Sequence, residues 1–148
     1  MKSYVHTQIG YALLAIYGVA IPIVGYLIRD VELNSVSQAA LILLLAALLT
    51  FSTLRVNVDH RTISIQFGFG IIRKSFSVSE IETYQVVRNR WYYGLGIRYT
   101  PRGWLYCVSG LSAIELQMKN GKYYRIGTDD PTGLASAVEE ALRVSAGQ

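Results

Sequence analysis

Two long apolar runs open the chain. Residues 3–28 and residues 33–54 contain no Asp, Glu, Lys or Arg, and Arg29-Asp30-Val31-Glu32 separates them. A bilayer core about 30 Å thick is crossed by a helix of about 20 apolar residues, and both runs reach that length. The pattern therefore predicts a transmembrane helical hairpin over residues 1–54, with spans at about 9–28 and 35–54.

Two other interpretations of the first run are weaker. The apolar region of a signal peptide is about 7–15 residues long, shorter than this run, and no small-residue cleavage site follows it. A pair of buried helices in a soluble bundle needs other surface to cover both, and a chain of 148 residues supplies too little of it.

After Leu54 the dominant period changes to two, which is typical of strands with one buried face. Short polar or glycine-rich turns separate the alternating runs, and Asn120-Gly121 is the strongest hairpin turn among them because both residues tolerate positive φ. The other predicted turns are Asp59-His60-Arg61 and Gly68-Phe69-Gly70. Seven strands are predicted, at 56–58, 63–67, 71–76, 81–88, 104–108, 113–118 and 122–126.

The period then changes again, to the 3, 4 spacing of an amphipathic helix over residues 131–145. Asp130 is placed to cap this helix and Pro131 to occupy its first position. The predicted fold class is α+β: the membrane hairpin, then residues 55–148 as a seven-stranded antiparallel barrel of the pleckstrin-homology-like type, closed by the C-terminal helix.

Three stretches carry a resemblance to a family. RNRWYYGLGIR at 88–98, GWLYCVSG at 103–110, and Gly121-Lys122 with IGTDDP at 126–131 resemble uncharacterised bacterial membrane proteins with a bacterial pleckstrin-homology-like domain. The resemblance covers roughly residues 55–145 and extends, more loosely, to the sublancin immunity protein. Those relatives often have Trp at the position of Leu95 and Asn at that of Cys107. The resemblance implies the barrel fold and says little about activity.

Charge predicts the orientation in the membrane. The loop between the two spans carries one positive and two negative charges, whereas Arg55, Arg61, Arg73 and Lys74 follow the second span. Lys and Arg concentrate on the cytoplasmic side of membrane spans. We therefore expect a multi-pass protein of the inner (cytoplasmic) membrane with both termini in the cytoplasm.

The sequence holds no recognisable catalytic set, and it predicts no enzyme, cofactor or metal site. Asp129-Asp130 is explained by helix capping, and His60 lies in a predicted turn. The glycine pairs at 68–70 and 94–96 lack the Lys-Ser/Thr of a phosphate loop. One cysteine, Cys107, excludes an internal disulfide and fits a reducing compartment.

One segment, residues 88–104, stands out because it combines arginines and aromatic residues with no acid. Guanidinium groups suit phosphate, and aromatic rings wedge between lipid headgroups. Residues 55–104 carry a net charge of +5 and residues 105–148 carry −1. Three roles are open for the segment: a lipid-binding site, a site for a protein partner, or a purely structural loop. Binding of nucleic acid is disfavoured because the segment is expected to be tethered beside a bilayer. The candidate binding residues are Arg88, Arg90, Trp91, Tyr92, Arg98 and Arg102.

These observations predict a membrane-anchored, non-catalytic binding or assembly module at the cytoplasmic face. Its expected partners are the bilayer, anionic lipid headgroups, a second copy of the chain or another membrane protein. The alternatives are an accessory subunit of a membrane transporter or enzyme, and a bacteriocin-immunity or envelope-protection protein.

Overall fold

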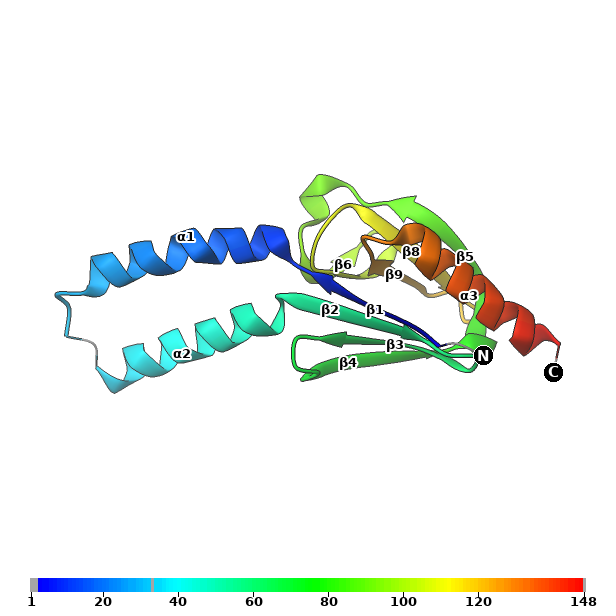
Figure 1. Cartoon of the computed structure of the whole chain (residues 1–148), viewed down its shortest axis with the longest axis horizontal. Helices are drawn as coiled ribbons and strands as arrows, with labels where there is room; N and C mark the ends of the chain where they lie inside the picture. The colour runs from blue at the N-terminus through cyan, green and yellow to red at the C-terminus, as the bar shows by residue number, and fades with distance from the viewer. Residues whose placement is uncertain (1–2, 33, 148) are drawn as a thin grey trace.

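The computed structural model describes residues 3–32 and 34–147 and shows an α+β protein (Figure 1). Two helices extend in one direction from a β-rich body, and a third helix lies on the body itself. The body contains a four-stranded sheet in the order β1-β2-β3-β4 and a five-stranded sheet in the order β5-β8-β9-β7-β6. The strands are β1 (Tyr4–Ile9), β2 (Thr53–Val58), β3 (Thr62–Phe67), β4 (Ile72–Ser77), β5 (Ile81–Arg88), β6 (Gly96–Thr100), β7 (Gly103–Cys107), β8 (Ser112–Met118) and β9 (Tyr123–Gly127).

The helical hairpin is inserted between two neighbouring strands of the first sheet. Strands β1 and β2 pair antiparallel from Tyr4↔Val58 to Ile9↔Thr53, although 43 residues lie between Ile9 and Thr53. Just beyond this pair, the backbone N–H of Gly10 donates to Ser52 O at 2.7 Å. The two ends of the hairpin are therefore held together by the sheet.

Strand β1 corrects the predicted start of the β-rich region, which placed residues 1–54 in the hairpin. The sequence YVHTQI at 4–9 is uncharged but half polar, so it merged with the apolar run that follows it. Helix α1 runs over Tyr11–Ile28, and helix α2 over Ser35–Thr50 rather than to residue 54. The side chain of Asn34 caps α2 by accepting from Ser37 N at 2.8 Å.

The two helices present their apolar side chains to the surroundings. Thr50 is the one buried residue of these two described helices, and the helices lie apart along most of their length (Figure 1). Helix α1 is long and apolar enough to span a membrane, whereas α2 is a shorter apolar helix of 16 residues.

The predicted seven-stranded barrel is corrected to two separate sheets. All seven predicted strands are present, and β1 and β6 are additional strands of the described chain. Strand β4 does not pair with β5, because the 3-10 turn η1 (Val78–Glu80) carries the chain from the first sheet to the second. Each sheet thus keeps two open edges, and the barrel does not close.

The core lies between the two sheets and under helix α3 (Pro131–Ala146). Alternate residues of β2 and β3 point inward, as the period of two predicts. Helix α3 contributes Leu134, Val138 and Ala141. The predicted cap is confirmed, because Asp130 Oδ1 accepts from Gly133 N at 2.9 Å and Pro131 begins the helix.

Candidate membrane-contact surface

The body has two distinct ends. The hairpin-proximal end is the one where Gly10 precedes α1 and Ser52 follows α2. The distal end lies at the far termini of the same strands and carries the β2–β3 turn, residues 59–61, and the β8–β9 turn, residues 119–122.

A chain of contacts places the basic aromatic segment at the hairpin-proximal end. A Cβ at Gly10 would lie 3.0 Å from Val108 O, so the β7–β8 turn passes close to the start of α1. Gln8 Nε2 donates to Ser109 O at 2.9 Å. Two residues further on, Leu111 O accepts from Asn89 N at 2.6 Å. The 3-10 turn η2 (Trp91–Tyr93), which follows Asn89, lies beside the root of the hairpin (Figure 1).

The segment turns sharply so that its aromatic rings stand outward. Tyr93 N donates to Arg90 O at 3.0 Å, which closes the turn η2. Gly94 then takes φ +71°, a left-handed conformation that residues with a side chain rarely adopt, and the chain enters β6. As a result Trp91 is 81% exposed and Tyr92 is 55% exposed.

Arg90 and the rings beside it form one connected cluster. The Arg90 guanidinium donates to Tyr92 Oη and lies 5.7 Å from the centre of the Tyr92 ring. This hydrogen bond raises the pKa of Arg90 above its ordinary value. The rings of Trp91 and Tyr92 meet edge to face with centroids 5.9 Å apart. The cluster therefore presents a permanent positive charge next to two exposed aromatic rings.

Two more of the candidate arginines flank this cluster. Arg88 ends β5 opposite Ser112, next to the β7–β8 turn, and is exposed. Arg98 is exposed on β6, with its Nε held by Leu95 O at 3.0 Å. Arg102 is different: it lies beyond the far end of β6, and its guanidinium is 3.7 Å from the Glu115 carboxylate. The structure groups five of the six candidate residues and separates Arg102 from them.

A buried ionic network supports the segment from below. Gln85, Glu115 and Arg125 are cross-strand neighbours on β5, β8 and β9. Glu115 is 1% exposed, and it accepts from Arg125 Nε and from Gln85 Nε2, each at 2.6 Å. Arg125 Nη1 also donates to Asn89 Oδ1 at 3.2 Å. This last contact connects the buried charge pair to Asn89, which precedes Arg90 and the exposed turn η2.

Acidic residues are unevenly distributed between the hairpin-proximal end and the side of helix α3. Residues 60–79 and residues 83–114 contain no Asp or Glu, and these stretches supply both the β3–β4 turn and the basic aromatic segment. Glu139 and Glu140 lie on helix α3, which extends away from the hairpin (Figure 1). The hairpin-proximal end is thus positive and the helix side is more acidic.

Asp129 and Asp130 join β1 to the start of α3. Asp129 Oδ1 lies 2.5 Å from His6 Nε2, and Asp130 Oδ2 accepts from Tyr4 Oη at 3.1 Å. Burial, followed by the nearby Asp130 carboxylate, raises the pKa of Tyr4. The sequence did not reveal these two contacts, because 126 and 123 residues separate the partners. Both carboxylates serve to connect elements of the fold.

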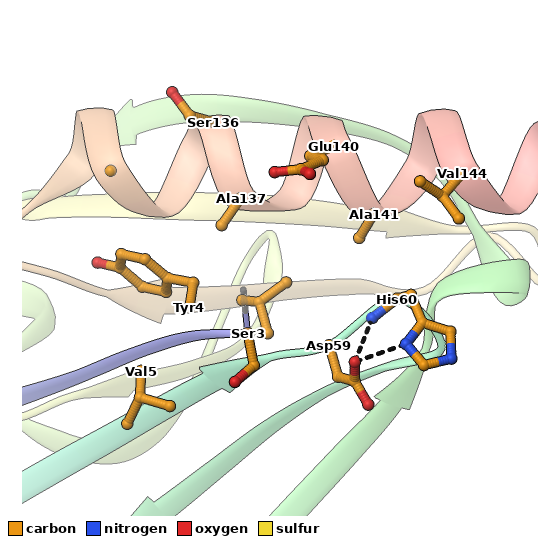
Figure 2. Close-up of a pocket in the computed structure, with 12 residues that line it drawn as sticks. Ser3, Tyr4, Val5, Asp59, His60, Ser136, Ala137, Glu140, Ala141 and Val144 are labelled. Atoms are coloured by element: carbon orange, nitrogen blue, oxygen red, sulfur yellow. Dashed lines mark hydrogen bonds and ion pairs between the residues drawn. The ribbon is translucent and has the colours of Figure 1, made fainter. Parts of the chain in front are cut away.

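A groove of about 850 Å³ lies at the distal end between β1, the β2–β3 turn and α3 (Figure 2). Its charged groups include Asp59 and Glu140. Asp59 accepts from both the backbone N–H and the ring of His60, at 2.8 and 2.6 Å, and the pKa of Asp59 is lowered by these bonds. Among residues 3–32 and 34–147, no group of three or more His, Cys, Asp and Glu is placed to hold a metal ion.

Comparison of the chain with protein-family models, curated proteins and solved structures finds no match.

Proposed function

We propose that this protein is a membrane-anchored, non-catalytic binding module whose basic aromatic segment binds anionic lipid headgroups. The observation that carries the proposal is the position of this segment relative to the two apolar helices. The turn η2, which carries Trp91 and Tyr92, lies at the end of the body from which the two apolar helices leave, and Arg88, Arg90 and Arg98 flank it in the chain. A bilayer that holds those helices faces this segment, and the distal end faces away from it.

The hairpin in this proposal crosses the membrane twice. Helix α2 has 16 residues and is about 24 Å long at 1.5 Å per residue. That is shorter than a core of about 30 Å, and local thinning of the bilayer accommodates such a mismatch at modest cost. The short loop between the helices lies outside the cytoplasm and the β-rich body inside, because the Lys and Arg residues follow the second span.

A pair of reporter fusions tests this topology. A reporter enzyme that is active only outside the cytoplasm should be active after Asn34 and silent after Gln148. The opposite pattern would place the β-rich body outside, and equal activity at both sites would exclude a hairpin.

Lipid binding is best tested with the body freed from its hairpin. A fragment that starts at Thr53 would lack β1 and leave an edge of β2 unpaired. Since Ile9 and Thr53 are paired neighbours, an Asn-Gly turn joining Ile9 to Thr53 keeps both strands. This variant should bind vesicles that contain phosphatidylglycerol more tightly than vesicles of phosphatidylcholine, and it should lose that preference at high salt.

A matched pair of triple substitutions locates the binding. Each Lys or Arg near an anionic surface contributes about 1 kcal/mol, so replacing Arg88, Arg90 and Arg98 by Gln should weaken vesicle binding by up to roughly a hundredfold. Replacing Arg61, Lys119 and Lys122 by Gln removes the same charge from the distal end and should have a much smaller effect. Equal losses from both variants would show that net charge acts rather than this surface. Absence of binding to anionic vesicles would favour a protein partner for the segment.

A further inference from the structure

A second exposed apolar group lies at the hairpin-proximal end, on the other sheet. The turn between β3 and β4 carries Phe69, which is 86% exposed, and Ile71, which is 74% exposed. Single exposed apolar side chains are common on soluble proteins and need no explanation. Here two of them stand within three residues at the tip of one turn, beside the end of a helix whose apolar side chains are exposed too.

Gly68 fixes this turn against the end of helix α2. Its φ is +52°, and a Cβ at this position would lie 2.7 Å from Thr50 O and 2.8 Å from Thr50 Cα. Its backbone N–H donates to Thr53 O at 2.9 Å. The tip of the turn therefore lies next to the residue that ends α2, and Figure 1 shows it on the same side of the body as the two helices.

A cation stands beside these apolar side chains, as it does in the basic aromatic segment. Arg73 is exposed, and its Nε donates to Gly70 O at 2.7 Å, which holds the guanidinium at the turn. No acid occurs between His60 and Ser79. Arginine next to exposed apolar side chains suits a negatively charged interface with an apolar interior better than it suits water or an acidic protein.

The two exposed groups lie on opposite sides of the hairpin root. The β3–β4 turn belongs to the first sheet, Trp91 follows the edge strand of the second sheet, and α1 and α2 leave the body between them (Figure 1). The hairpin, the β3–β4 turn and Trp91 would make three contacts that are not in line, and three such contacts determine the tilt of a rigid body on a surface. A hairpin alone leaves the body free to tilt.

We propose that the tip Phe69-Gly70-Ile71 inserts into the interfacial layer of the same bilayer that the hairpin crosses. This inference rests on the proposed function, in which the hairpin-proximal end faces an anionic membrane. The tip and Trp91 then contact the headgroup region on either side of the hairpin and hold the body upright. The occupant of this surface is the lipid bilayer, and a protein partner in its place would leave these side chains out of contact with acyl chains.

The test uses the full chain in nanodiscs of phosphatidylglycerol and phosphatidylcholine. Trp91→Phe and Trp104→Phe remove both native tryptophans, and Phe69→Trp then places a single fluorophore at the tip. The matched control is His60→Trp in the same background, because His60 lies at the opposite end of β3. Lipids with brominated acyl chains should quench most of the emission of the Phe69→Trp variant, which should also shift to shorter wavelength. They should leave the His60→Trp variant nearly unchanged.

Equal quenching at the two positions would overturn the insertion of the tip. A third variant, Trp104→Phe alone, keeps Trp91 as the reporter of the basic aromatic segment and separates the two proposals. Quenching of Trp91 without quenching of the Phe69→Trp variant would overturn the tip contact and leave the proposed function standing. Quenching of the Phe69→Trp variant without quenching of Trp91 would support the tip contact and overturn lipid binding by the basic aromatic segment. Circular dichroism of each variant checks that the sheets are intact, and an exposed position such as Phe69 tolerates Trp without repacking.

Discussion

Strand β3 joins two turns that differ in kind. At its distal end, Asp59, His60 and Arg61 form a polar turn in which Asp59 accepts two hydrogen bonds from His60. At its hairpin-proximal end, Gly68 and Gly70 take positive φ and present Phe69 almost fully to the surroundings. Both turns reverse the chain between antiparallel strands. Folding therefore requires neither the exposed ring of Phe69 nor the absence of acidic residues around the hairpin-proximal turn.

The second sheet repeats the contrast. Its distal β8–β9 turn is built from Lys119, Asn120, Gly121 and Lys122, whereas its hairpin-proximal end carries Trp91 and Tyr92 on the turn η2. Exposed apolar side chains thus occur on turns of both sheets at the hairpin-proximal end, and the second sheet also exposes the Tyr99–Trp104 ring pair next to its distal β6–β7 turn. Under the proposed function, the hairpin-proximal turns meet the bilayer and the distal turns meet water.

The largest effect is expected from breaking the buried pair beneath the basic aromatic segment. Arg125→Met removes the nearest cation of Glu115 and the donor to Asn89, and losing one member of a buried ion pair costs about 3–5 kcal/mol of stability. Urea unfolding of the hairpin-free variant should show this loss. Arg143→Met is the matched control: it breaks the exposed pair with Glu139 and should cost at most about 1 kcal/mol.

Hydrogen exchange sharpens the same comparison. In Arg125→Met under native conditions, amides of residues 89–94 should exchange faster, while those around the distal turn at 59–61 should change less. If both ends lose protection equally, the network stabilises the whole fold and does not support this segment in particular.

A smaller effect is expected at the start of helix α3. Asp130→Ala removes the side chain that accepts from Gly133 N, and lost N-caps cost about 0.5–2 kcal/mol. It also removes the acceptor of the Tyr4 hydroxyl, so the value should lie in the upper part of that range. Thermal unfolding measures the loss, and Glu140→Ala on the exposed face of the helix serves as the control. Vesicle binding should persist, and its loss in a folded Asp130→Ala protein would contradict a purely structural role for Asp130.

The smallest effect concerns pH at the distal turn. The backbone N–H and the ring of His60 lower the pKa of Asp59 in the folded state below its usual 3.8. A depressed carboxyl pKa stabilises the fold above the unfolded-state value, and this contribution is lost as pH falls through the folded-state value. Asp59→Asn should therefore flatten the dependence of stability on pH below about pH 4 and leave lipid binding unchanged. An unaltered acid profile would show that the two hydrogen bonds contribute nothing to stability in solution.

Local features of the fold were predictable from the sequence because their causes lie within a few residues. Asn120-Gly121 and Asp59-His60-Arg61 are turns whose conformational preferences belong to those residues. Asp130 and Pro131 predict the start of α3 for the same reason, since a cap requires only the next three residues. The alternation in 63–67 predicts a strand with one buried face, and Ile63, Ile65 and Phe67 are indeed buried.

The pairing of distant segments was decided by the tertiary structure. Residues 4–9 become a strand because β2 offers a hydrogen-bonding edge. The pattern of apolar and polar residues within this six-residue segment does not predict that partner. Glu115 and Arg125 look like two surface charges in the sequence; cross-strand register on the outer face of the second sheet makes them a buried pair. The placement of Phe69 and Trp91 on opposite sides of the hairpin root likewise follows from how the two sheets pack. Sequence alone thus determined the helices, seven of the nine described strands and the turns that join predicted strands, through backbone preference and the period of burial. The packing of the sheets decided which turns gather at the hairpin-proximal end, because that depends on contacts between residues that are far apart in the chain.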